Sequence, residues 1–164
     1  MPVTPTPTIR PANRNDATEI HRMLVAIAKA TGHDSKITST ADDIARDGFG
    51  AQPAFRALIG EQDGRAVALC LSFASYSTFR GKPGIYIQDL YVDPALRGSG
   101  FAQRLLARAV TRAHADGCAY MRLSVDARNA AGQKFYVKTG MRAADDERIF
   151  VLDGDAFIAL ARSG

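Results

Sequence analysis

Hydrophobic residues near the start of the chain recur at helical spacing. Between residues 15 and 28 they fall on one face of a helix, which Asn15 or Asp16 can cap and Gly32 is expected to end. The residues of this apolar face are Ile20, Met23, Leu24, Ile27 and Ala28. A second, weaker helix is predicted over residues 41–47. The chain therefore places two helices early, before its main strands.

The segments around these helices have the composition of β-strands. Residues 9–11 are predicted to form a short edge strand, because Pro11 lacks the N–H that an interior strand donates. Residues 65–76 form the longest predicted strand and carry the apolar run Ala66–Leu71. Further strands are predicted at 55–61 and 85–92, with turns at Gln62-Asp63-Gly64 and at Gly81-Lys82-Pro83-Gly84.

The second half of the chain alternates helices with strands. Helices are predicted over residues 100–115, 129–138 and 154–162, and strands over 120–125 and 148–152. Gly140 stands where the second of these helices needs a left-handed C-cap. The order of elements implies an α+β fold with a mixed sheet, in which a helix crosses over between two parallel strands.

Length and composition fit one compact domain. With 164 residues, 46% of them hydrophobic, the chain can bury a core but is short for two domains. We expect a domain over residues 9–164 after a disordered tail, residues 1–8, which lacks the apolar stretch of a signal peptide. No apolar run approaches the roughly 20 residues of a membrane span, so we expect a cytoplasmic protein with no membrane partner.

Charge and cysteine content narrow the function only slightly. A net charge of +4 fits an anionic partner without choosing among nucleic acid, membrane and polyphosphate. Binding of nucleic acid is disfavoured, because no basic tract is interleaved with stacking aromatic residues. Cys70 and Cys118 lack metal-ligand spacing and are too few for a disulfide scaffold, so both are expected to be small core residues.

The most informative segment is 88–106, where a predicted strand enters a glycine loop and the loop enters a helix. Gly98 and Gly100 allow unusual backbone angles and close approach of a ligand. N–H groups at a helix N-terminus bind phosphate oxygens, and Arg97 adds a charged donor at the same edge. The loop lacks the Gly-Lys-Ser/Thr of a P-loop, and Gln103 stands where a dinucleotide fingerprint needs its third glycine. A phosphate site and a plain strand-to-helix turn remain as alternatives.

A second segment, Asn129–Gly140, carries a candidate proton donor. Asn129 can cap the helix, and Phe135 is expected to anchor it in the core, so that its neighbour Tyr136 points elsewhere. A phenol with a pKa near 10 can protonate a departing thiolate whose conjugate acid has a pKa near 8.5. Taken alone, Tyr136 is better interpreted as a half-buried tyrosine whose hydroxyl is bonded to backbone.

Together these segments resemble the GNAT superfamily of N-acetyltransferases. Arg97-Gly-Ser-Gly-Phe-Ala102 is similar to the family's Arg/Gln-x-x-Gly-x-Gly/Ala loop for the pyrophosphate of coenzyme A, and Asn129–Gly140 to its Asn…Phe-Tyr…Gly segment. The resemblance covers nearly the whole chain after the tail and is nearest to the diamine (spermidine/spermine) and thialysine acetyltransferases. The segments that carry this finer resemblance are Ile9–Ala12, Asp47–Gly50, Gly81-Lys82 with Gln88–Val92, and Arg148–Asp153.

The resemblance implies a mixed, mostly antiparallel sheet flanked by helices, with a bulge that splays the strand before the loop. Backbone exposed there would pair with the pantetheine arm of acetyl-CoA, the cosubstrate, and bind the thioester oxygen. Tyr136 stands where the family has its general acid, Asp89 or water is left to deprotonate the amine, and no metal is required. The residues implied in binding coenzyme are Leu90, Tyr91, Val92, Arg97, Gly98, Ser99, Gly100, Phe101, Ala102, Gln103, Asn129 and Gly132.

The implied acceptor is a primary amine of a small molecule, with Gln88, Phe79 and His33 as candidate contacts. The chain departs from the polyamine enzymes here: the end of the first helix lacks their acidic cluster, and Ser77 and Phe79 stand in place of an acid and a tryptophan. Gln88 replaces a glutamate thought to help deprotonate the amine. A polycation would find little compensating charge, so we do not expect a long polyamine as the acceptor.

Two alternatives to this interpretation remain. Within the class, the protein could be a diamine or polyamine acetyltransferase proper. Outside it, the chain could be an acyl-CoA-binding module without catalysis, which the presence of Tyr136 argues against. The related subgroup forms homodimers through its C-terminal strand, so the resemblance also implies a homodimer.

Overall fold

A computed structural model describes residues 6–164. Of the predicted tail, residues 1–5 lie outside this part, whereas Thr8 already belongs to the first strand. The chain forms two compact units, Met1–Asn129 and Ala130–Gly164. None of the helices in the described part is long and apolar enough to span a membrane.

The first unit contains a five-stranded sheet in the order β1-β2-β3-β4-β5. Its strands are β1 (Thr8–Pro11), β2 (Arg56–Gln62), β3 (Arg65–Ser77), β4 (Lys82–Val92) and β5 (Met121–Leu123). All neighbours are antiparallel except β4 and β5, which are parallel. The predicted mixed sheet is confirmed, with β1 at its edge. The turn predicted at Gly81–Gly84 is shorter than expected, because Lys82 already pairs with Ser77.

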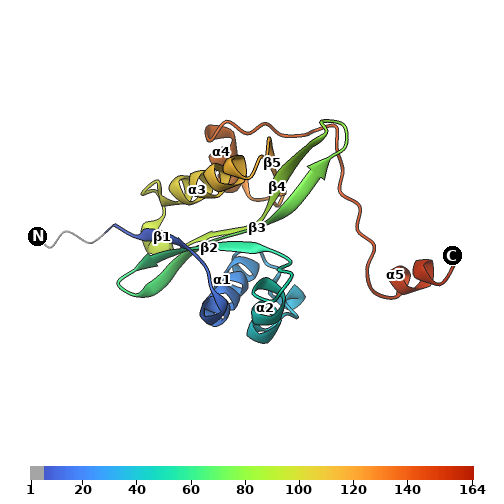
Figure 1. The fold of residues 1–164 in the computed structure, drawn as a ribbon, viewed down its shortest axis with the longest axis horizontal. Helices are drawn as coiled ribbons and strands as arrows, with labels where there is room; N and C mark the ends of the chain where they lie inside the picture. The colour runs from blue at the N-terminus through green and yellow to red at the C-terminus, as the bar shows by residue number, and fades with distance from the viewer. Residues whose placement is uncertain (1–5) are drawn as a thin grey trace, which may run out of the picture. The chain divides into compact units, whose positions relative to one another are not determined.

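Helices cover both faces of this sheet (Figure 1). The helices are α1 (Ala17–Ala30), α2 (Ala41–Gly48) and α3 (Phe101–Ala115), with short 3-10 turns η1 (Arg14–Asp16), η2 (Asp34–Lys36) and η3 (Pro94–Leu96). α1 and α2 lie on one face and α3 on the other. α3 is the crossover between the parallel strands β4 and β5, as predicted.

The core explains why the run Ala66–Leu71 is apolar without alternation. Successive side chains of a strand point to opposite faces, and here both faces are covered. Leu69 and Leu71 of β3 belong to one core cluster with Ile20 and Met23 of α1. The Cα position of Gly60 in β2 faces α3, where an added Cβ would lie 2.5 Å from the Phe101 ring. Gly60 thereby lets the first turn of α3 pack directly on the sheet.

The start of α1 agrees with the prediction in position, because Asp16 is its N-cap residue, but the Asp16 side chain makes no capping hydrogen bond to α1. Asn13, rather than Asn15 or Asp16, is the capping side chain: it accepts a hydrogen bond from the N–H of Asn15 at 2.9 Å and begins η1, which runs into α1. Asp16 instead accepts both Nη groups of Arg10, at 2.8 and 2.9 Å. These bonds lower the pKa of the Asp16 carboxyl and tie β1 to the start of α1. Asn13 and Asp16 form a capping box, and their three-residue spacing in the sequence could have predicted Asn13 as the cap.

The second unit contains α4 (Ala130–Lys138) and α5 (Gly154–Ala161). Gly140 follows α4 with a φ of 95°, which confirms the predicted left-handed C-cap. The strand predicted at 148–152 is wrong, because the backbone there forms no strand. Its side chains are exposed, including Phe150 at 91%. Apolar, β-prone residues form a strand only beside a strand that pairs with them, and the sequence does not reveal that neighbour.

Candidate active site

β4 contains a bulge next to the point where its pairing with β5 ends, while its pairing with β3 continues. Leu71 of β3 pairs with Asp89, whereas the next residue, Ser72, pairs with Ile87, so Gln88 is an extra residue in β4. On the other side, the pairing of β4 with β5 ends at Ile87 and Leu123. Within residues 6–164, β4 therefore pairs from Gln88 onward with β3 alone, and no strand pairs with its other edge.

The bulge also decides which peptide groups face that open edge. Asp93 donates its N–H to Val67 of β3 at 2.8 Å. In an antiparallel ladder every second residue directs its N–H and C=O to the partner strand, so Leu90 and Val92 direct theirs away from β3. In agreement, the Nε of Arg97 lies 3.4 Å from the carbonyl oxygen of Val92. Tyr91, also predicted to bind coenzyme, points its peptide group to β3 instead.

The glycine loop connects β4 to α3 in a left-handed conformation. Gly98 and Gly100 have φ values of 77° and 80°, and Gly100 is the N-cap of α3. A Cβ added at either glycine would meet nothing within 4 Å, so the loop surface is open. The first N–H groups of a helix have no partner inside it, and those of Ala102 and Gln103 lie beside this loop. The loop thus has the backbone that an anion site needs.

The side chains around the loop divide into core and surface. Phe101 is 2% exposed, so any contact of this residue with a ligand comes from its backbone. Ser99 donates its hydroxyl to the carbonyl of Leu96 at 2.6 Å, which holds the loop in its turn. Arg97 and Gln103 are exposed on the outer side.

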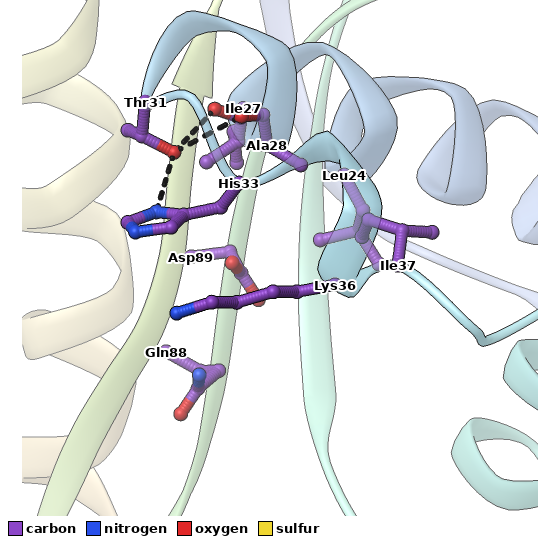
Figure 2. Close-up of a pocket in the computed structure, with 9 residues that line it drawn as sticks. All are labelled: Leu24, Ile27, Ala28, Thr31, His33, Lys36, Ile37, Gln88 and Asp89. Atoms are coloured by element: carbon purple, nitrogen blue, oxygen red, sulfur yellow. Dashed lines mark hydrogen bonds between the residues drawn. The ribbon is translucent and has the colours of Figure 1, made fainter.

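A pocket of about 310 Å³ lies between α1, the loop that follows it, and β4 (Figure 2). Its lining residues are Leu24, Ile27, Ala28, Thr31, His33, Lys36, Ile37, Gln88 and Asp89. Three residues predicted from the sequence as acceptor contacts or base, His33, Gln88 and Asp89, are brought together here. The volume is within the range of small-molecule sites.

His33 is oriented by the end of α1. The hydroxyl of Thr31 lies 3.0 Å from the carbonyl of Ile27 and 3.2 Å from that of Ala28, and it donates its one hydrogen to them. The Nδ1 of His33 lies 3.2 Å from the same hydroxyl oxygen, which is left to accept from it. This arrangement assigns the proton of neutral His33 to Nδ1 and leaves Nε2 as an acceptor.

Asp89 is the titratable group at the base of the pocket. Burial raises its pKa from the ordinary 3.8 to about 6, because the carboxylate loses hydration. Such a group is ionised at neutral pH and still basic enough to accept a proton. Burial, and then the nearby charge of Asp89, raise the pKa of the Cys70 thiol to about 12. Cys70 is a core residue, as predicted, and not a thiolate nucleophile.

The remaining predicted residues lie elsewhere. Phe79 is in the turn between β3 and β4, fully exposed, and does not line the pocket. Asn129 ends the first unit, and Gly132 and Tyr136 belong to α4 of the second. The Tyr136 side chain is half-buried, with its ring edge-on to that of Phe135 at 5.2 Å. Its role as proton donor stays a prediction.

Sequence reasoning missed the pocket residues that follow α1. Lys36 and Ile37 come from a loop whose composition carries no motif. Leu24 and Ile27 were predicted on the apolar face of the helix from their spacing; Leu24 packs against the core, and both residues also line the pocket. The available signal was the length of the loop between the two predicted helices, which is ample for side chains to reach the sheet.

The bulged strand, its free edge and the glycine loop at a helix N-terminus are the features that the sequence resemblance implied, and comparison with known proteins agrees with that resemblance. Residues 17–141 match the acetyltransferase (GNAT) family, and the match spans more than half of the chain. The chain therefore belongs to this family and is an N-acetyltransferase. The resemblance stated from the sequence is confirmed.

Named relatives point to the same subgroup as the sequence motifs. The chain is 28% identical to the thialysine N-epsilon-acetyltransferase of Bos taurus, over 93% of this chain and 96% of the relative. It is 30% identical to the spermidine/spermine N(1)-acetyltransferase-like protein 1 of Homo sapiens, over 80% of this chain and 20% of that longer protein.

Solved structures confirm the fold. An integron cassette protein from V. cholerae aligns with a TM-score of 0.81 at 14% identity, over 96% of this chain and 99% of the other. An aminoglycoside acetyltransferase from an uncultured soil metagenomic sample, crystallised with sisomicin, aligns with a TM-score of 0.75 at 16% identity, over 90% and 96%. The predicted α+β fold with a mixed, mostly antiparallel sheet is thus shared with both.

Proposed function

We propose that this enzyme transfers the acetyl group of acetyl-CoA directly to the primary amine of a small molecule, with residues 9–164 acting as one catalytic domain in the cytoplasm. The observation that carries the proposal is the bulge at Gln88 in β4. It joins a pocket with a proton acceptor, Asp89, to an open strand edge that leads into the glycine loop.

The coenzyme is proposed to bind along the open edge of β4 and to end at the loop. Leu90 offers its backbone N–H and C=O, and Val92 its N–H, which suit the amides of the pantetheine arm, whereas the Val92 carbonyl accepts from Arg97. The N-terminal turn of α3 offers N–H groups and the positive end of its dipole to the pyrophosphate, and Arg97 adds a charge. The open space at Gly98 and Gly100 supports this fit, because phosphate oxygens can approach the backbone there.

The proposed chemistry uses Asp89 of the pocket and, from the family resemblance, Tyr136. Asp89 takes a proton from the bound ammonium, and the neutral nitrogen attacks the thioester carbon. A backbone N–H of the open edge stabilises the negative charge that develops on the carbonyl oxygen. The C–S bond then breaks, and Tyr136 gives its proton to the departing thiolate. A covalent route through Cys70 is disfavoured by its burial and raised pKa.

The two alternatives are disfavoured by the pocket. A module that only bound acyl-CoA would need no proton acceptor, whereas burial brings the pKa of Asp89 close to neutral pH. Of the acceptors named for relatives, thialysine fits better than a polyamine. Among the lining residues Asp89 is the single carboxylate, and Lys36 adds a positive charge.

The Gly100→Glu substitution is expected to abolish the thermal stabilisation of the protein by acetyl-CoA. It places a side chain and a negative charge where the pyrophosphate is proposed to bind. At a ligand concentration of about 100 times Kd, the wild type should gain about 2.7 kcal/mol, or roughly 5–10 °C in Tm. Differential scanning fluorimetry with and without acetyl-CoA measures both proteins.

Gly117→Glu is the matched control for this experiment. Gly117 follows the other end of α3 with a φ of 87°, so both substitutions impose a similar backbone strain of about 1–2 kcal/mol. We expect the Gly117 variant to lose a similar stability without ligand and yet to keep the full shift with acetyl-CoA. A Gly100→Glu protein stabilised as strongly as the control would refute the loop as the coenzyme site.

We further propose that the protein is a homodimer formed through residues 148–152. This segment has a β-prone sequence, and its four apolar side chains are exposed: Ile149 at 73%, Phe150 at 91%, Val151 at 77% and Leu152 at 47%. Contiguous apolar side chains at a surface mark an interaction site more often than they mark a free surface. A second copy of the segment is the partner that suits it, because identical strands can pair in a symmetric interface.

Phe150→Asp is expected to convert the dimer to a monomer, because it buries a charge in the proposed interface. Sedimentation velocity at micromolar concentration measures the mass of each form. Phe79→Asp is the control, since Phe79 is equally exposed in a different part of the chain and is not in the segment. A monomeric wild type, or dissociation by the Phe79 variant as well, would contradict the proposed interface.

A further inference from the structure

The pocket beside Asp89 carries a second charge that the proposed chemistry does not use. Lys36, the last residue of η2, lines the pocket together with Gln88 and Asp89. Its side chain extends across the pocket toward the side where His33 and Gln88 lie (Figure 2). A flexible ammonium in that position faces whatever enters the pocket.

The ammonium of Lys36 is not neutralised by the protein. Within residues 6–164, no salt bridge holds Lys36. Nor does Lys36 compensate Asp89: a close cation would lower the pKa of that carboxyl, whereas burial raises it. Lys36 and Asp89 are thus two separate charges of opposite sign in one pocket.

The other charges near the pocket do not change this arrangement. Asp126 is bound by Arg128 at 2.9 Å, and the same guanidinium lies 3.5 Å from the carbonyl oxygen of Thr31. Asp34 belongs to the same short turn as Lys36 but does not line the pocket. The apolar residues of the pocket lining are Leu24, Ile27, Ala28 and Ile37.

We propose that Lys36 is a specificity-determining residue that binds a carboxylate of the acceptor. The acceptor class is then an amine with a carboxylate at the far end of a short apolar chain. The amine lies at Asp89, the chain lies along the apolar residues of the lining, and the carboxylate meets Lys36. This inference rests on the proposed function, because it takes the amine at Asp89 as the reacting group.

The same residue explains which acceptors are poor. A diamine of similar length would bring its second ammonium to the ammonium of Lys36, where the two charges repel. Lys36 is exposed, so water screens the interaction and each effect is expected to be about tenfold in kcat/KM rather than larger. The effect is expected mainly in KM, because Lys36 contacts the end of the acceptor that does not react.

Three probe acceptors of equal chain length isolate the charge at the far end. They are δ-aminovalerate with a carboxylate, pentylamine with a methyl group and cadaverine with a second ammonium. Acetylation is measured through the thiol that acetyl-CoA releases in the reaction. For the wild type we expect kcat/KM to fall about tenfold from δ-aminovalerate to pentylamine, and again from pentylamine to cadaverine.

Two substitutions then move the preference in opposite directions. Lys36→Met keeps the length and apolar stem of the side chain and should equalise δ-aminovalerate and pentylamine. Lys36→Glu should make cadaverine the best of the three acceptors. Lys29→Met is the control, because Lys29 is an exposed residue in the last turn of α1 that does not line the pocket. It removes the same charge from the protein and should leave the order unchanged.

Calorimetric titration of δ-aminovalerate into the protein separates this inference from the proposed function. Binding that Lys36→Met abolishes, without acetylation of any amine, would support the role of Lys36 and overturn the proposed reaction. Acetylation of all three amines at equal kcat/KM, or an order that Lys36→Met leaves intact, would overturn the role of Lys36 alone. If the wild type neither binds δ-aminovalerate nor acetylates any of the amines, both the role of Lys36 and the proposed reaction are overturned.

Discussion

Replacing Asp89 by asparagine is expected to lower kcat by about 10² to 10⁴, the usual loss when a positioned proton acceptor is removed. Asparagine keeps the shape of the side chain and its place in the pocket, so acetyl-CoA should still bind. A primary amine with a pKa near 10 arrives as its ammonium form, and the partly apolar pocket lowers that pKa toward the range of Asp89. Without Asp89 the proton must leave to water.

The pH dependence of the wild type should report the same group. Burial holds the pKa of Asp89 at about 6, so kcat/KM is expected to fall below that pH as the carboxylate is protonated. The Asp89→Asn variant should lack this acidic limb. Steady-state kinetics between pH 5 and pH 9, in buffers of constant ionic strength, measures both profiles. An acidic limb that survives in the variant would assign the base to another group.

The same substitution should stabilise the protein. The pKa of Asp89 is raised in the folded state, so between pH 3.8 and about 6 the folded protein binds more protons than the unfolded chain. The free energy of unfolding of the wild type therefore falls across this window, and that of Asp89→Asn does not. The difference should be near zero below pH 4 and on the order of 2–3 kcal/mol above pH 6.

Asp34→Asn is the control for both measurements. Asp34 is an exposed carboxylate in η2, close to the pocket in sequence but not part of its lining. We expect its kcat, its acidic limb and its stability profile to match those of the wild type. Loss of activity in Asp89→Asn without any gain in stability would mean that Asp89 is not desolvated as its burial indicates.

Much of the fold could be predicted because local physics already specifies it. The run Ala66–Leu71 is apolar at every position, which requires cover on both faces, and α1 and α3 supply it. Gly98 and Gly100 are left-handed because a tight entry into α3 needs positive φ, which glycine adopts freely. In both cases the residues that carry the signal lie in, or next to, the element that they predict.

The site could be predicted only in part, because its shape depends on residues far apart in the chain. The family resemblance implied a bulge in this strand, but no residue type marks its position at Gln88, which arises from the register between β3 and β4. Lys36 reaches the pocket through an irregular loop, and a charged residue there predicts only a solvated surface. Phe79 lies in the exposed turn between β3 and β4 and does not line the pocket.

Tyr136→Phe is expected to lower kcat by about 10² to 10⁴ if the phenol protonates the departing thiolate. The substitution removes one hydroxyl and little volume, and the ring keeps its edge contact with Phe135. The proton is needed only as the C–S bond breaks, so KM for acetyl-CoA and the affinity for coenzyme A should barely change.

Tyr120→Phe distinguishes a catalytic hydroxyl from a structural one. The Tyr120 hydroxyl bonds the hydroxyl of Ser75 at 2.9 Å, within the sheet region of the first unit. Its loss should reduce stability by about 1 kcal/mol and leave kcat within a factor of two or so, because one ordinary hydrogen bond is removed. Steady-state kinetics and coenzyme A binding isotherms are measured for both variants and the wild type. If Tyr136→Phe has a near-normal kcat, the Tyr136 hydroxyl is structural and water is the proton donor. If Tyr136→Phe loses rate and Tyr120→Phe does not, Tyr136 is the residue that protonates the departing thiolate.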